Sequence, residues 1–134
     1  QRGILMMLMR LQNQLKNTLV LVSHDMGVHY QVTHRMGIMY SGSLVELGKT
    51  DDIFAEPLHP YTRMLINALP RVGDKSPKIG IPGRPPALSN PPPGCRFAPR
   101  CPDATEICRQ AVPTFSEVRP GRFVACHKLN REVV

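Results

Sequence analysis

Four cysteines are the side chains of this 134-residue chain best suited to chemistry, and all lie within its last forty residues: Cys95, Cys101, Cys108 and Cys126. The surrounding segment is rich in proline and poor in bulky apolar residues, so a hydrophobic core alone is not expected to hold it. Four thiolates that converge on one metal centre would do so, and the number four suggests a complete coordination shell. The spacing is neither the paired C-x2-C of a zinc ribbon nor the cysteine run of bacterial ferredoxins. The cysteines therefore predict a metal site without naming the metal.

A second candidate is His24, which directly follows an apolar, β-rich run over residues 18–22. A continuous run of this kind is typical of a strand that is buried on both faces of a parallel sheet. Open α/β sheets bind ligands at the carboxyl ends of such strands. His24 is therefore the leading catalytic or phosphate-sensing candidate, although a lone histidine is more often structural.

These candidates need elements that position them, and hydrophobic periodicity predicts those elements. The predicted helices lie at about 4–15, 25–33, 50–55 and 60–69, and the predicted strands at 18–22, 36–40 and 44–47. Asp25 and Pro60 suit the first turns of their helices. The alternation predicts an α/β fold. Two or three strands in 56 residues cannot close such a sheet, so we expect an incomplete sheet with helices.

Composition divides the chain at about residue 56. All 14 prolines lie at or after Pro57, and the formal net charge of +7 arises entirely from residues 57–134. We therefore expect residues 1–56 to be the end of one fold and residues 57–134 to be a proline-rich, largely irregular, metal-stapled extension. The sequence shows no secretory leader and no transmembrane run, which predicts a cytosolic protein with reduced thiols.

Several segments resemble one protein family. Residues 19–25 (LVLVSHD) are similar to the switch-histidine segment of ABC transporter ATPases, and residues 35–48 are similar to the segment that comes after it in that family. The later segments similar to the family are PLHPYT at 57–62, IPGRPP at 81–86, PPGCRFAPRCP at 92–102, and the cysteines at 108 and 126. Together they resemble the ATP-binding subunits of oligopeptide and dipeptide ABC importers over nearly the whole chain.

The resemblance implies a function for the intact subunit. Members of this family hydrolyse ATP, bound with Mg²⁺, between two nucleotide-binding domains, and drive import of peptides through membrane permease subunits. The implied partners are those permeases, a second ATPase subunit and, indirectly, a substrate-binding protein, all at the cytoplasmic face of the membrane. His24 would be the switch histidine that contacts the γ-phosphate and helps orient the attacking water, a role consistent with catalysis by positioning. The transported solute stays open between peptides and others such as nickel.

The chain lacks the family's G-x-x-x-x-G-K-[ST] loop, glutamine loop, signature motif and Walker B carboxylates. We therefore expect it to be the C-terminal part of such an ATPase, and to neither bind ATP tightly nor hydrolyse it alone. Its sheet edges could lead to self-association.

The resemblance also implies a cofactor, because some members hold a [4Fe-4S] cluster on four cysteines that match Cys95, Cys101, Cys108 and Cys126. A structural zinc ion on the same ligands is the alternative, with His127 able to replace Cys126. Four arginines close in sequence would offset the charge of gathered thiolates, namely Arg96, Arg100, Arg109 and Arg122.

Two unrelated hypotheses compete with the importer. A metal-stapled, basic nucleic-acid module would explain the charge and the cysteines, but aromatic residues make up only 5% and tryptophan is absent, so no stacking platform is expected. A secreted disulfide protein would explain the cysteines alone. Neither accounts for the apolar run that ends in Ser23-His24-Asp25.

Overall fold

The computed structural model describes residues 2–70, 73, 77 and 80–130. The elements are α1 (Arg2–Leu15), α2 (Met26–Val32), β1 (Arg35–Tyr40), β2 (Ser43–Lys49), α3 (Thr50–Ala55), α4 (Pro60–Asn67), the 3-10 turn η1 (Ala98–Arg100), α5 (Glu106–Gln110), β3 (Phe115–Arg119) and β4 (Arg122–Ala125). The four helices predicted from periodicity are confirmed, as is the hairpin of β1 and β2. Among the described residues, no helix has the length and apolar character needed to cross a membrane.

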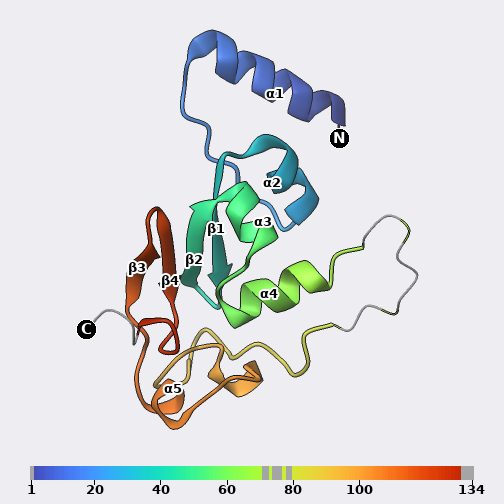
Figure 1. Ribbon diagram of the computed structural model, residues 1–134. Helices are drawn as coiled ribbons and strands as arrows, with labels where there is room; N and C mark the ends of the chain where they lie inside the picture. Colours follow the sequence, from blue (N-terminus) through green and yellow to red (C-terminus); the bar gives the residue numbers. More distant parts are fainter. Residues whose placement is uncertain (1, 71–72, 74–76, 78–79, 131–134) are drawn as a thin grey trace.

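The strands form one antiparallel sheet in the order β1-β2-β4-β3 (Figure 1). Strand β4 pairs with β2, where Glu46 lies opposite Val124 and Leu47 opposite Phe123. The sheet therefore takes strands from both sides of residue 56. Helices α2 and α3 lie beside the β1–β2 hairpin, whereas the cysteine-bearing loops and α5 lie below α4 in the view of Figure 1.

The core joins the sheet to the extension through aromatic residues. Phe97, in the extension, is fully buried and packs against Tyr40 of β1 and Tyr61 of α4, with ring centroids 5.1 and 5.4 Å apart. The remaining core residues are Met26, Met36, Ile38, Val45, Ile53 and Ile66. Alternate residues of β1 are buried, which is the pattern of a strand with one covered face.

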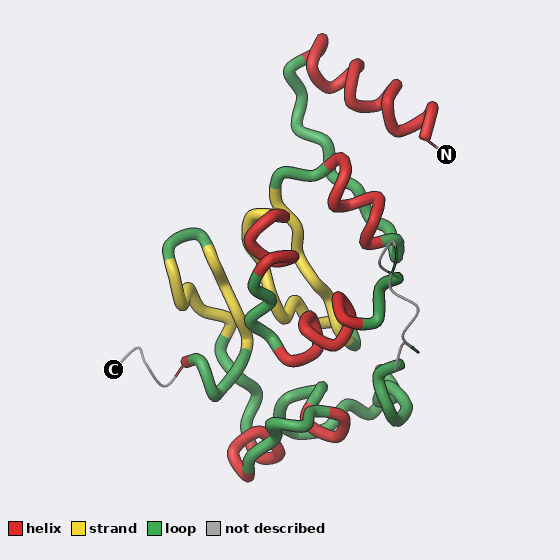
Figure 2. Tube along the Cα trace, turned by 45° about the vertical axis from the view of Figure 1, so that its right-hand side comes forward, coloured by secondary structure: helices red, strands yellow, loops and turns green. Residues whose placement is uncertain are grey.

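The strand predicted over residues 18–22 is wrong. These residues form no regular structure, and the side chains of Val20 and Val22 are 83% and 91% exposed. A strand exists only by pairing its backbone with a neighbour, and the described residues offer this segment no partner in the sheet. Figures 1 and 2 show it as a loop that links α2 to α1, which stands away from the sheet in both views.

The prediction of a largely irregular extension is wrong where β3 and β4 form a hairpin and join the sheet. The two strands are joined at Pro120 and Gly121, and Gly121 has a φ of +73°. Proline is common at the second position of a type II turn, and glycine suits the third, because glycine adopts positive φ without strain. That dipeptide was the local signal for the hairpin.

Candidate metal centre and the buried network beside it

The four cysteines line one cavity of about 330 Å³. Cys95 and Cys101 flank η1, Cys108 lies in α5, and Cys126 directly follows β4. His59, Pro60 and Phe97 line the same cavity, so the start of α4 forms part of its wall. The structure thus brings together all four residues that the sequence singled out as metal ligands.

Backbone contacts within the loops set the first three cysteines. The N–H of Cys95 donates to the carbonyl of Cys108 at 2.8 Å, and the N–H of Cys101 donates to the carbonyl of Ala98 at 3.3 Å. Gly94 is required at this crossing, because a Cβ there would lie 2.3 Å from the Cys108 carbonyl oxygen. Hydrogen bonds within residues 94–108 therefore set the backbone that carries Cys95, Cys101 and Cys108.

The surroundings of Cys95 and Cys101 disfavour the charged thiolate form. Burial raises the pKa of Cys101 to about 11 and also raises that of Cys95. The negative charges of Asp103, Cys126 and Cys95 raise the pKa of Cys101 further. Without a bound cation, these two thiols are protonated at neutral pH.

The four arginines that lie close in sequence to the cysteines have hydrogen-bond or ion-pair partners other than the thiols. Arg96 donates to the carbonyl of Ser41, Arg100 to the hydroxyl of Tyr40 and to backbone carbonyls, Arg109 pairs with Glu106, and Arg122 pairs with Glu46. Arg96, Arg100 and Arg122 thus hold loops and sheet together, whereas the Arg109 pair is exposed within α5. A hydrogen-bonded guanidinium keeps its charge, so the expectation that the arginines offset thiolate charge stays a prediction.

A single metal ion requires several donor side chains close around one point. Within the part of the chain that the structure describes, no group of three or more His, Cys, Asp or Glu side chains is placed to hold a metal ion. Thiolates around a single zinc ion lie about 4 Å apart, given a Zn–S distance near 2.3 Å. The Nε2 atom of His127 lies 2.8 Å from the Ala111 carbonyl oxygen, so this nitrogen is not available to replace Cys126.

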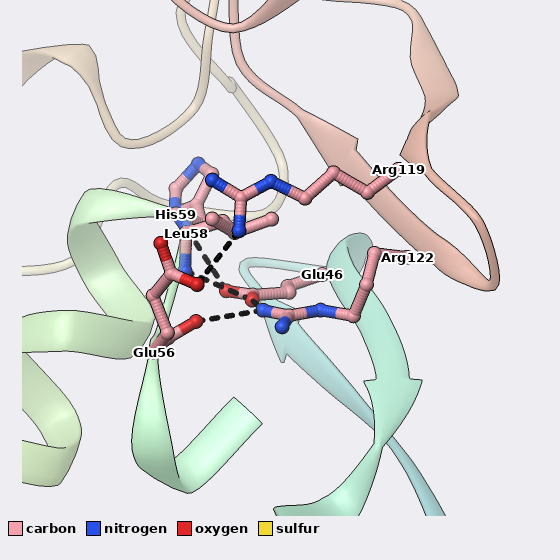
Figure 3. A network of polar contacts seen from close by, with 6 residues as sticks. All are labelled: Glu46, Glu56, Leu58, His59, Arg119 and Arg122. Carbon is pink, nitrogen blue, oxygen red and sulfur yellow. Dashed lines mark hydrogen bonds and ion pairs between the residues drawn. The ribbon is translucent and has the colours of Figure 1, made fainter. Parts of the chain in front are cut away.

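A buried polar network, which the sequence analysis missed, lies beside the cavity (Figure 3). The Glu46 side chain is fully buried, and its carboxylate accepts from the N–H groups of Leu58 and His59 at 3.0 and 2.9 Å. Arg122 of β4 donates to the same carboxylate at 2.8 Å and to the carbonyl of Glu56 at 2.8 Å. The network fastens β4 and the start of α4 to β2.

A surface pair completes this network. Arg119 donates to the Glu56 carboxylate at 2.6 Å, and that hydrogen bond, with the guanidinium charge, lowers the pKa of Glu56. Both side chains are largely exposed. Solvent screens such a pair, so the buried Glu46–Arg122 contact carries most of the attachment.

His24 lies apart from the cysteines. Its side chain is exposed, and it lines a hollow of about 410 Å³ together with residues of β1, Tyr61 and Leu65. Asp25 caps α2, as predicted, by accepting from the N–H of Val28 at 3.1 Å. An exposed imidazole held just before a capped helix is free to contact a ligand brought to it.

Comparison with known proteins gives a consistent result. Residues 45–108 match the family described as the C-terminal region of oligopeptide/dipeptide transporters. The chain is 44% identical over 128 residues to the dipeptide transport ATP-binding protein DppD of Caldanaerobacter subterraneus subsp. tengcongensis, covering 95% of this chain and 39% of that protein. It is 37% identical to the oligopeptide transport ATP-binding protein AppF of Bacillus subtilis, covering 95% and 40%. The chain therefore spans about two fifths of the length of these relatives.

Proposed function

Because this chain belongs to the family of oligopeptide and dipeptide ABC transporter ATP-binding proteins, we propose that it is part of the energy-coupling subunit of a peptide importer. The relatives that match 95% of its length carry the proposal, since their names describe peptide transport and ATP binding. In this function ATP with Mg²⁺ is the substrate of the intact subunit. The permeases, a second ATPase subunit and, indirectly, a substrate-binding protein are its partners at the cytoplasmic face of the membrane.

His24 is the residue proposed to act on ATP. Its exposure and its position before the α2 cap leave the imidazole free to meet a γ-phosphate presented by the rest of the subunit. There it would orient water and stabilise charge, which is how proteins assist phosphoryl transfer. The sequence holds no Walker A or Walker B residues, so the chain alone is proposed to be inactive. Appreciable ATP turnover by the purified chain would contradict this.

The cysteine cavity is proposed to hold a [4Fe-4S] cluster on Cys95, Cys101, Cys108 and Cys126. Four sulfur donors around one cavity are the set that such clusters use. When bound, the cluster would link the loops to the sheet and could change oxidation state. Zinc on the same residues is the alternative.

Metal analysis tests this proposal. We expect chain purified without oxygen to contain about four irons and four acid-labile sulfides, with visible absorption typical of a cluster. Replacement of each of the four cysteines by serine, one at a time, should lower iron and sulfide content. Thr105→Val is the matched control, because its hydroxyl contacts the Cys108 sulfur at 3.3 Å without being a ligand. One zinc without sulfide would replace the cluster by the alternative, and protein without metal would contradict both.

A further inference from the structure

His127 has no role in the function proposed above, although it lines the cysteine cavity and directly follows Cys126. Its side chain is half-buried, and its Nε2 atom lies 2.8 Å from the carbonyl oxygen of Ala111. A carbonyl oxygen only accepts, so Nε2 carries a proton and donates this hydrogen bond. The side chain next to the fourth cysteine is therefore held by one defined contact with the backbone of another segment.

The residue that accepts this hydrogen bond belongs to the helix of another cysteine. Ala111 ends α5, where its N–H donates to the carbonyl of Ile107 at 2.9 Å. Cys108 lies in the same short helix. The His127 ring thus connects the segment that carries Cys126 to the helix that carries Cys108.

The sheet does not by itself set the position of Cys126. The ladder between β3 and β4 ends where Ala125 pairs with Phe115, so Cys126 lies just outside it. Residues 126–130 then form a turn with two backbone hydrogen bonds to the Cys126 carbonyl, at 3.1 and 3.0 Å. These bonds fix the shape of the turn, but the position of the turn against the other cysteines depends on contacts with its side chains.

Two other side chains of the turn have partners, but they do different work. Asn130 donates to the Thr114 carbonyl at 2.6 Å, which fixes the far end of the turn next to β3. Lys128 lies 3.4 Å from the Asp103 carboxylate, but its side chain is 66% exposed, so solvent screens the pair. Among the described residues, His127 is therefore the half-buried side chain that links this turn to a cysteine-bearing helix.

We propose that His127 is a positioning residue for the cysteine cavity: its hydrogen bond to the Ala111 carbonyl sets Cys126 against Cys108. It acts through Cys126 and is not itself a ligand. The value of this placement for a metal rests on the proposed function. The placement itself is a property of the folded chain without metal and can be measured there.

Three substitutions separate the hydrogen bond from the ring and from the rest of the turn. His127→Phe keeps a ring of similar size but has no donor. His127→Gln loses the ring but keeps an amide nitrogen about as far from the backbone as Nε2, so it can still donate to the Ala111 carbonyl. Lys128→Met removes the exposed ion pair of the same turn and is the matched control.

The experiment measures the alkylation rate of each cysteine by mass spectrometry, on the reduced chain in the presence of a chelator. A half-buried thiol reacts mainly when its segment opens locally. In His127→Phe we expect labelling of Cys126 to rise about fivefold, as the loss of one typical hydrogen bond predicts. Labelling of Cys101, the internal reference, should stay unchanged. His127→Gln should restore slow labelling of Cys126, and Lys128→Met should leave all four rates unchanged.

Three results would overturn the proposal: an unchanged rate at Cys126 in His127→Phe, an equal rise at all four cysteines, or a rate at Cys126 in His127→Gln as fast as in His127→Phe. Near-ultraviolet circular dichroism checks that the variants are folded. If His127→Phe is not folded, His127→Asn takes its place, because its amide is too short to reach Ala111.

The proposed function and this inference fail in different ways. If metal analysis finds no metal, the cluster proposal fails, while the alkylation rates still decide the role of His127. If iron is present, faster loss of iron to a chelator from His127→Phe than from His127→Gln supports the same role. Equal loss from the two variants would contradict a role of His127 in holding the metal.

Discussion

Two regions of the molecule, helix α1 with the loop after it (residues 2–24) and the sheet with its extension, both carry apolar residues but differ in how far these are buried. Most apolar residues of α1 are exposed, including Ile4 and Leu15, and none of those described is fully buried. In β1, Met36, Ile38 and Tyr40 are buried, and Met39 points to the exposed face. Both segments are amphipathic, and in the described part of the chain only β1 has elements packed on its apolar face. Apolar periodicity therefore predicts a face that needs a partner, not a face that has one.

The same comparison holds for polar groups. In residues 10–24 the polar side chains are exposed apart from the half-buried Gln12, whereas in the sheet a carboxylate and a guanidinium are buried together. Burying two charges is costly unless their hydrogen bonds are made. Glu46 meets that condition with three donors, which makes it the point at which the sheet is most sensitive to change.

The largest effect is therefore expected from Glu46→Ala. This change leaves the Arg122 charge buried and removes the acceptor of two backbone N–H groups, so the free energy of unfolding should fall by about 3–5 kcal/mol. Urea unfolding followed by circular dichroism measures it. Glu56→Ala is the control, because its exposed carboxylate is screened by solvent and its loss should hardly move the midpoint. Equal effects of the two changes would contradict the contrast between buried and exposed pairs.

A smaller effect is expected from acid. Burial lowers the pKa of His59 to about 4 from an ordinary value near 6.5. As pH falls from 6.5 to 4, this histidine binds a proton in the unfolded chain but stays neutral in the folded chain. The free energy of unfolding should fall over this range by about 3 kcal/mol in all. Urea unfolding of the metal-free chain at pH 7, 5.5 and 4.5 measures the slope.

His59→Gln provides the control for that slope. Carboxylates such as Glu56, whose pKa is lowered, also lose stability in acid, but they do so below their ordinary pKa and in both proteins. The difference between the two chains therefore isolates His59. Identical slopes in the wild-type chain and the variant would show that this ring does not stay neutral in the folded state.

Much of the fold could be predicted because its signals are local. The α1 periodicity, the Asp25 cap, the glycine turn between β1 and β2 and Pro60 at the start of α4 each depend on a few neighbouring residues. The gathering of the cysteines was predicted from their number alone, and all four do line one cavity.

The parts of the fold and site that were not predicted depend on contacts between residues distant in sequence. Glu46 and Arg122 are 76 positions apart, and no local pattern links them. Strand β3 alternates between exposed and half-buried residues, so its hydrophobic signal is weak. The error at residues 18–22 has the opposite cause, because a strong local signal there lacks a partner strand.

The smallest effect on stability is expected from a substitution in residues 18–22, where Val20 and Val22 are exposed. Val22→Ser removes an apolar side chain that is 91% exposed, so the free energy of unfolding should change by no more than about 0.5 kcal/mol. The matched control is Val124→Ser in β4, where the side chain is fully buried and the same change both leaves a cavity and buries a hydroxyl. Urea unfolding of both variants makes the comparison. A large loss in Val22→Ser would show that residues 18–22 are covered in solution, as by self-association. In that case sedimentation at increasing concentration should show weaker association for Val22→Ser than for the unmodified chain.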